Sequence, residues 1–321
     1  MSGDRPPRRT SDSKMGVGKP VARVGRAPMT TGRDRNVPTP RHRGVLAARS
    51  AAITVMINAA MKAARGLRRD FGEIENLQVS RKGPGDFVTV ADRQAERTLR
   101  EELQRVRPNY GFLGEEGTDI KGDGVHRWIV DPLDGTTNFL HGIPHFAISI
   151  ALERDGEIVA GVVYEPIGDE LFWAEKGAGA FLDTPQSKSH RLRVSSRRQM
   201  GDALIATGIP FRGRGDHGVF AGQLQAVMAE TAGVRRFGSA ALDLAFVAAG
   251  RFDGFWESGL APWDTAAGWL LVREAGGMVN EIGGRAYGLN SATILASNGQ
   301  ITAALDRLVS ARPTARAGRK A

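Results

Sequence analysis

Two acidic residues and several small polar ones stand together in the segment Asp131-Pro132-Leu133-Asp134-Gly135-Thr136-Thr137. Pro132 fixes one backbone torsion and disfavours helix at Asp131, which predicts a rigid turn at the end of a strand. Such a turn can direct both carboxylates and the Leu133 carbonyl at one point, and hard cations such as Mg²⁺ prefer oxygen ligands of this kind. Alone, the segment is equally compatible with a structural turn, because Asp favours turns and Gly permits them.

Three further features make a metal-and-phosphate site the better interpretation. The residues after Asp134, Gly135 to Asn138, are expected to open a short helix whose free N–H groups face the same point, as in anion sites. Glu115-Glu116 follows apolar residues and is predicted to lie at a strand end. Asp264 follows Pro262 and Trp263 at a predicted helix start; alone it would be interpreted as a helix N-cap, but it adds a third acidic residue. A cation site beside an anion site suits a phosphate ester.

Other catalytic chemistries find little support in the sequence. The chain has no cysteine, which excludes disulfides, thiolate metal sites and cysteine nucleophiles. His141 and His145 have metal-like spacing, but Pro144 opposes a helix between them, so a structural role is expected. No Gly-x-Ser-x-Gly nucleophile elbow is present. The Gly177-Ala178-Gly179 segment lacks a third glycine and a following helix, which predicts a hairpin rather than a dinucleotide site.

The elements that must position these residues follow from hydrophobic periodicity. Helices are predicted from Val45 onward and over residues 92–106, 216–233, 239–249 and 264–275, the last closed by Gly276-Gly277. Strands are predicted over residues 128–130, ending at Asp131, and over 145–153, 158–164, 171–175, 180–182 and 253–257. Asp155-Gly156 is a hairpin signal between two of them. Because helices and strands come in blocks, the pattern favours a layered α+β sandwich over a doubly wound fold.

The net charge of +9 is concentrated at the two ends of the chain. Residues 1–46 hold eleven Lys or Arg and three Asp, and residues 311–321 hold four basic residues and no acidic one, which leaves −3 for the rest. Both ends are therefore predicted to be disordered basic tails around a catalytic domain at 47–310. The long tail has no aromatic residue to stack on bases, which weakens an RNA-binding interpretation. No run approaches the ~20 apolar residues of a membrane span, and a cytoplasmic location is expected.

These segments, in this order, resemble the inositol monophosphatase superfamily, with the greatest likeness to bacterial members of the suppressor type. Residues 128–139, Trp-Ile-Val-Asp-Pro-Leu-Asp-Gly-Thr-Thr-Asn-Phe, match its first signature, and residues 263–268 followed by 274–277 match its second. Further matches are Lys82, residues 86–89, Asp92, residues 114–116, and residues 236–241 through Glu257. The resemblance covers about residues 46–310 and implies a layered αβαβα sandwich.

The resemblance also implies a metal site. Glu115, Asp131 and the Leu133 carbonyl would hold one Mg²⁺, and Asp131, Asp134 and Asp264 a second. A weaker third ion would lie near Glu115, with Asp92 in the supporting network. The family mechanism is attack on phosphorus by a metal-activated water, which Glu115 and Thr136 orient, without a covalent phosphoenzyme.

The substrate would occupy the residues around this metal site. By resemblance, the Gly135 and Thr136 amides bind the phosphate beside Asp134, and the leaving alcohol contacts Gly238, Ser239, Ala240 and Glu257. Myo-inositol monophosphate is the expected substrate, and the enzyme is expected to be lithium-sensitive and homodimeric. Fructose-1,6-bisphosphate, histidinol phosphate and adenosine bisphosphate stay open as alternatives. A different class of function, binding to RNA or RNA polymerase through the basic tails, also stays open.

Overall fold

The computed structural model describes residues 49–71, 79–83, 86–210 and 215–310. The predicted basic tails lie outside these residues. For Lys82 and residues 86–89 the structure describes the backbone only. The described part contains seven α-helices and three β-sheets. No helix in it is both long and apolar enough to cross a bilayer.

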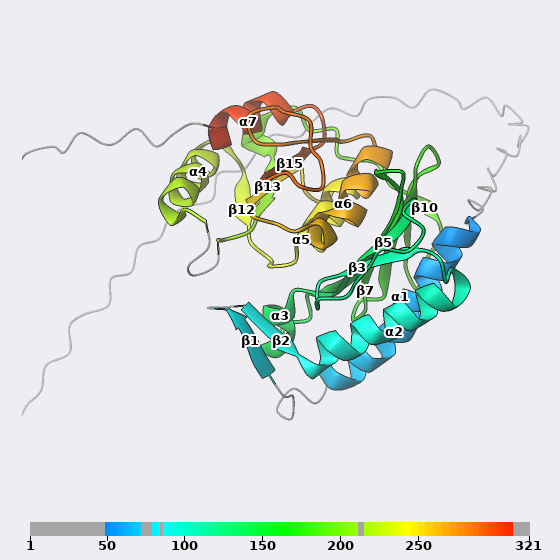
Figure 1. Ribbon diagram of the computed structural model, residues 1–321. Helices are drawn as coiled ribbons and strands as arrows, with labels where there is room; N and C mark the ends of the chain where they lie inside the picture. Colours follow the sequence, from blue (N-terminus) through cyan, green and yellow to red (C-terminus); the bar gives the residue numbers. More distant parts are fainter. Residues whose placement is uncertain (1–48, 72–78, 84–85, 211–214, 311–321) are drawn as a thin grey trace, which may run out of the picture. The chain divides into compact units, whose positions relative to one another are not determined.

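The largest sheet has eight strands and is antiparallel except for one parallel pair, the strands at residues 111–114 and 126–134. In sheet order these are β10 (His190–Arg191), β9 (Gly179–Asp183), β8 (Glu170–Glu175), β7 (Glu157–Glu165), β6 (Ala147–Arg154), β5 (His126–Asp134), β3 (Gly111–Gly114) and β4 (Asp119–Ile120). One of its faces is covered by α1 (Ala51–Phe71) and α2 (Val90–Val106), and the short α3 (Thr136–Leu140) follows β5 (Figure 1).

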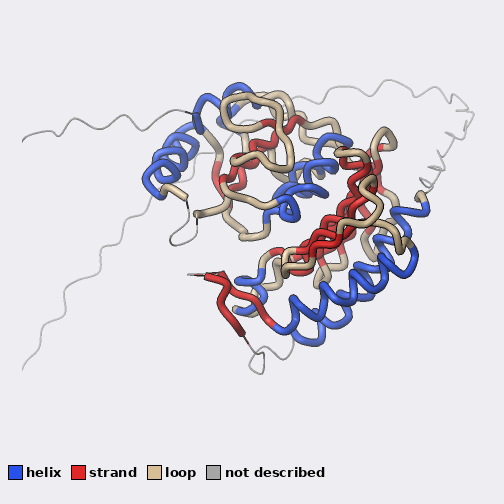
Figure 2. The backbone as a smooth tube through the Cα atoms, in the orientation of Figure 1, coloured by secondary structure: helices blue, strands red, loops and turns tan. Residues whose placement is uncertain are grey.

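The opposite face of this sheet packs against a central pair of helices, α5 (Ala240–Ala248) and α6 (Pro262–Glu274). Beyond them lies a five-stranded mixed sheet in the order β12 (Gly233–Arg235), β11 (Leu204–Thr207), β13 (Gly254–Ser258), β15 (Thr293–Ser297) and β14 (Met278–Asn280). Its outer face carries α4 (His217–Glu230) and α7 (Thr302–Ser310). A separate hairpin joins β1 (Val79–Gly83) and β2 (Asp86–Thr89). The layers confirm the predicted αβαβα sandwich (Figure 2).

Alternating side chains explain why the large sheet supports helices on both faces. Along β5, Trp128 and Val130 lie in the apolar core beneath α1 and α2, whereas Ile129 lies in the core around α5 and α6. The predicted strand reads as a continuous apolar run because both of its faces are buried.

Most predicted elements are present, with shifted ends. The helix predicted from Val45 begins at Ala51 within the described residues, where the Ser50 hydroxyl accepts a hydrogen bond from Ile53 N. Both hairpin predictions are confirmed: Asp155 and Gly156 have positive φ between β6 and β7, and Gly177–Gly179 joins β8 to β9. The peptide N–H groups of Gly177 and Gly179 donate to the Glu274 carboxylate. These N–H groups are therefore already hydrogen-bonded within the chain and are not free to bind a phosphate.

Candidate active site

The first two carboxylates share one face of the large sheet because β5 contains a bulge. The predicted end of the strand at Asp131 was wrong, since β5 continues to Asp134. Asp131 pairs with Ser149 and Asp134 pairs with Ala147, so three residue steps on β5 oppose two on β6. In a regular strand, residues three apart point to opposite faces, but the extra residue returns Asp134 to the face of Asp131. Pro132, which has no N–H for the ladder, lies within this irregularity.

The third carboxylate comes from the start of α6. The predicted helix start at Asp264 was wrong, because the helix begins at Pro262 and Ala261, not Asp264, is its N-cap. Asp264 stands in the first turn, and its Oδ2 accepts a hydrogen bond from Ala261 N at 2.7 Å. The Ser149 hydroxyl on β6 donates to the Trp263 carbonyl at 3.1 Å, which fastens this helix start to the sheet face that carries Asp131.

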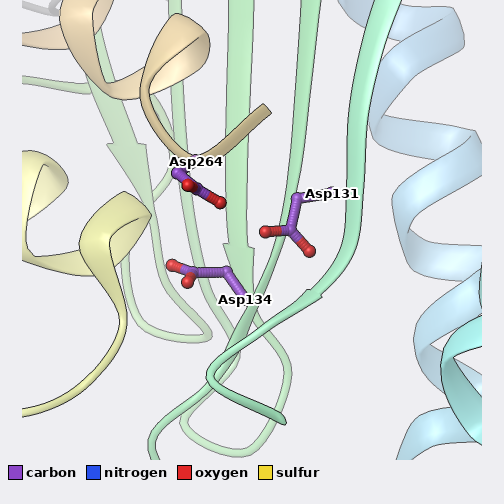
Figure 3. A group of neighbouring side chains, drawn as sticks. All are labelled: Asp131, Asp134 and Asp264. Carbon is purple, nitrogen blue, oxygen red and sulfur yellow. The ribbon is translucent and has the colours of Figure 1, made fainter. Parts of the chain in front are cut away.

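Asp131, Asp134 and Asp264 each place a carboxylate oxygen within 4.8 Å of the others. Their side chains point toward one another from β5 and α6 (Figure 3). Burial first, and then the charges of Glu115 and the other two aspartates, raise the pKa of Asp131 well above its ordinary value. Burial and the Asp134 charge raise the pKa of Asp264 to about 8. Without a cation, the three negative charges would oppose one another in a largely buried site.

Asp134 is the best supported of the three by hydrogen bonds. Its Oδ2 accepts from the Ser239 hydroxyl at 2.6 Å and from Ala241 N at 2.7 Å, both at the start of α5. Burial raises the pKa of Asp134 to about 6, and these hydrogen bonds limit the rise. Asp134 therefore connects the bulge of β5 to the central helices.

The oxygen-only donor set fits Mg²⁺. Hard cations of this kind bind carboxylate and carbonyl oxygens, usually with some water. The raised pKa values identify charges that a cation would neutralise. The cluster has no nitrogen or sulfur ligand among the described residues, which argues against a typical zinc site.

Glu115 reaches this region from the neighbouring strand. Gly114 on β3 is in parallel register with Val130 on β5, so the next residues along each strand, Glu115 and Asp131, lie side by side. Behind this turn the buried Glu96 carboxylate accepts hydrogen bonds from Glu116 N at 2.8 Å and from the Thr118 hydroxyl at 2.5 Å. Sequence reasoning missed Glu96, whose position on the inner face of α2 was the only available signal.

The turn after β5 has the expected short helix. Gly135 is its N-cap with φ of 101°, in the left-handed region that favours glycine. The Thr136 hydroxyl lies 3.1 Å from both Asp92 Oδ1 and the Leu133 carbonyl. Asp92 thus contacts Thr136, while the Leu133 side chain is buried in the core under α1 and α2. The Asn138 amide donates to the Phe237 carbonyl at 2.7 Å, which holds the segment before Gly238 against α3.

These groups surround a pocket of about 380 Å³. The predicted site residues that line it are Glu115, Asp131, Leu133, Asp134, Gly135, Thr136, Gly238, Ser239, Ala240, Glu257 and Asp264. Asp92 alone among the predicted residues is outside this lining and meets it through Thr136. The structure therefore brings together residues from four separate parts of the chain.

Glu257 extends from β13 on the side of the pocket away from the large sheet. Burial, followed by the charges of Asp264 and Asp134, raises its pKa to about 8. Gly208 lies against it, because a Cβ there would approach Glu257 Oε1 to 1.9 Å. Only glycine leaves room for the carboxyl in this position.

Two lining residues carry charge that sequence reasoning did not assign: Asp243 in the first turn of α5, and Arg236. Arg236 begins a segment that resembles the family but was given no role, and Asp243 lies within a helix of otherwise apolar residues. His145, by contrast, has the predicted structural environment. The centroids of the His145 and Phe237 rings lie 5.0 Å apart, and burial lowers the pKa of His145.

Comparison with known proteins gives a consistent picture. Residues 48–314 match the model of the inositol monophosphatase family. The chain is 61% identical over 263 residues to an inositol-1-monophosphatase of Rhizobium meliloti, covering 82% of this chain and 97% of that protein. A Nus factor SuhB of Pseudomonas aeruginosa is 43% identical, covering 76% and 91% of the respective chains. The crystal structure of the extragenic suppressor protein suhB from Bartonella henselae is 56% identical, with a TM-score of 0.77 and coverage of 81% and 98%.

Proposed function

Because this chain belongs to the inositol monophosphatase family, we propose that it is a Mg²⁺-dependent phosphatase that hydrolyses myo-inositol monophosphate to inositol and phosphate. The observation that supports this best is the convergence of Asp131, Asp134 and Asp264 in one pocket, next to the start of α3. The name of the Rhizobium meliloti relative supports inositol 1-phosphate as the substrate. The catalytic domain is assigned to residues 47–310.

In this proposal Glu115, Asp131 and the Leu133 carbonyl hold one Mg²⁺, and Asp131, Asp134 and Asp264 hold another. Bound Mg²⁺ supplies Lewis-acid chemistry: it polarises phosphoryl oxygens and lowers the pKa of water. The chain's own contribution is to fix the ligands. Ser239 and Ala241 N hold the Asp134 carboxylate, and Ala261 N holds that of Asp264.

The same proposal assigns the phosphate to the Gly135 and Thr136 amides. Asp92 and the Leu133 carbonyl orient the Thr136 hydroxyl, which with Glu115 directs the attacking water toward phosphorus. The leaving alcohol lies toward Gly238, Ser239, Ala240 and Glu257, where the Glu257 carboxyl accepts hydrogen bonds from its hydroxyls.

A phosphate-release assay over inositol, fructose, histidinol and adenosine phosphates, with and without Mg²⁺, tests both the reaction and the substrate. We expect inositol monophosphate to be the preferred substrate and Mg²⁺ to be required. The matched variant Asp131→Asn should lose nearly all activity and keep the circular dichroism spectrum of the wild type. Activity that resists a chelator, or wild-type activity in Asp131→Asn, would refute the metal assignment.

A second role in transcription is supported by the relative called Nus factor SuhB, which is 43% identical to this chain. We propose that such a role would use the basic tails at residues 1–46 and 311–321. Binding to RNA that weakens with salt, and that disappears when both tails are deleted, would support it. Equal binding by full-length and tail-deleted protein would contradict the assignment to the tails. We also expect a cytoplasmic homodimer, which light scattering and fractionation can test.

A further inference from the structure

Asp243 is a buried carboxyl that has no role in the proposed metal, phosphate or alcohol sites. It is 1% exposed, yet it belongs to the lining of the active-site pocket. Its backbone N–H donates to the Ser239 carbonyl at 3.0 Å, in the first turn of α5. The same Ser239 donates its hydroxyl to Asp134. The helix start therefore fixes Asp243 relative to the candidate metal ligand.

One oxygen of the Asp243 carboxyl lacks the hydrogen bond that a buried polar atom needs. Its Oδ1 has no hydrogen-bond partner in the described part of the protein. Two other buried carboxyls have several. Asp253 accepts from Leu204 N and from the Ser195 hydroxyl, and Glu165 accepts from two backbone N–H groups. An unpaired buried oxygen on a residue that lines a pocket is a group that a ligand can satisfy.

The electrostatic surroundings of Asp243 include the alcohol end of the pocket. Burial raises the pKa of Asp243 well above its ordinary value, and the Glu257 charge adds to this effect more than the Asp134 charge does. Arg236, which also lines the pocket, acts in the opposite sense and makes the smallest contribution. Asp243 on α5 and Glu257 on β13 therefore present two carboxyls from different elements to the same end of the pocket.

We propose that Asp243 is a substrate-binding residue whose Oδ1 accepts a hydrogen bond from a hydroxyl of the leaving alcohol. Together with Glu257 it would select alcohols with more than one hydroxyl, such as a cyclic polyol, over alcohols that carry none besides the esterified oxygen. This inference rests on the proposed phosphatase function. Asp243 would add a residue that determines substrate specificity, and it lies in α5, whose other residues are apolar.

The test compares a phosphate with ring hydroxyls and one without. For each variant we would measure kcat and KM with myo-inositol 1-phosphate, and the inhibition constant of cyclohexyl phosphate, in the presence of Mg²⁺. Asp243→Ala should lower kcat/KM for inositol 1-phosphate by roughly 10- to 100-fold, because a hydrogen bond to a buried carboxyl is lost. The inhibition constant of cyclohexyl phosphate should not change. Asp243→Asn keeps a side-chain oxygen acceptor and should restore most of the lost kcat/KM.

A matched control separates this role from a structural one. Asp183→Ala also removes a buried carboxyl, but one that accepts from Ser189 N at 2.7 Å and pairs with Arg49, outside the pocket lining. Asp183→Ala should have a lower thermal unfolding midpoint. It should leave kcat/KM for inositol 1-phosphate unchanged relative to the inhibition constant of cyclohexyl phosphate. Asp243→Asn should be at least as stable as the wild type without substrate, because the Asp243 Oδ1 is unpaired there and the pKa of the buried carboxyl is raised.

Equal weakening of both phosphates by Asp243→Ala, or no change in either, would overturn the inference while leaving the phosphatase assignment intact. A wild-type protein that releases no phosphate from inositol 1-phosphate would overturn the proposed function, and the inference with it. The two failures are therefore distinguishable by the wild-type measurement alone.

Discussion

The clustered carboxylates predict that Asp264→Asn changes stability and activity in opposite directions. Without metal, burial and the Asp134 charge raise the pKa of Asp264 to about 8, from an ordinary value of 3.8. A shift of this size corresponds to at most about 6 kcal/mol of lost stability once the group is charged. Water reaches the half-buried side chain and its neighbours share the proton, so we expect Asn to recover about 2–3 kcal/mol. For a domain of this size that is a rise in Tm of about 4–12 °C.

The sign of this effect depends on pH. A carboxyl with a raised pKa in the folded state contributes stability below its unfolded pKa, and this contribution is lost as pH rises through the folded pKa. The metal-free wild type should therefore lose stability as pH rises from about 4 to about 8, whereas Asp264→Asn should lose less. The difference in Tm should be small at about pH 5 and full at about pH 9.

The assay is thermal unfolding in the presence of a chelator at both pH values, monitored by circular dichroism. Asp253→Asn is the control, because its buried carboxylate accepts from Leu204 N at 2.8 Å and pairs with Arg197, so Asn should destabilise it at both pH values. With Mg²⁺ present, Asp264→Asn should release almost no phosphate. If Asp264→Asn proves less stable than the wild type at about pH 9, the argument from carboxylate repulsion is wrong.

Two further predictions rest on single contacts, and a third rests on the family mechanism. Gly208→Ala would place a methyl group against the Glu257 carboxyl, and should raise KM for inositol monophosphate several-fold while metal-dependent stability stays unchanged. Glu96→Ala removes the acceptor of Glu116 N, so kcat should fall about 10-fold as Glu115 loses its position, and an unchanged kcat would contradict this. Lithium should inhibit phosphate release in a manner that added Mg²⁺ alters, and insensitivity to lithium would count against the family mechanism.

The residue types of the site could be predicted from the sequence, but the bulge that unites them could not. Asp131 and Asp134 are conspicuous beside Pro132, and the turn signal after Asp134 was correct. A strand that ended at Asp131 would have needed no special geometry. The observed strand continues, and only its register against Ser149 and Ala147 reveals that the two carboxylates share a face. Register depends on a partner strand, which local sequence does not specify.

Asp243 and Glu96 illustrate a second limit. Each lies on a helix whose periodicity predicts the helix correctly, but periodicity gives no reason to separate a buried acid from a solvated one. The difference arises from tertiary contacts: Glu96 meets the turn after β3, and Asp243 faces a pocket bounded by β13. The role of each acid therefore depends on its polar surroundings in the folded chain: Glu96 has two donors, and Asp243 Oδ1 has no partner among the described residues.

Several buried acidic groups gather around the pocket with few hydrogen bonds to stabilise their charges. Three apolar cores surround the two main sheets, and buried carboxyls elsewhere, such as Asp253, accept several hydrogen bonds. Around the pocket, acidic groups repel one another, and Asp243 leaves an oxygen unpaired. Such features lower stability, and a well-packed scaffold retains them where a ligand repairs them. A cation repairs the aspartate cluster and a hydroxylated alcohol repairs Asp243, so the two defects correspond to the two halves of a phosphate ester's binding site.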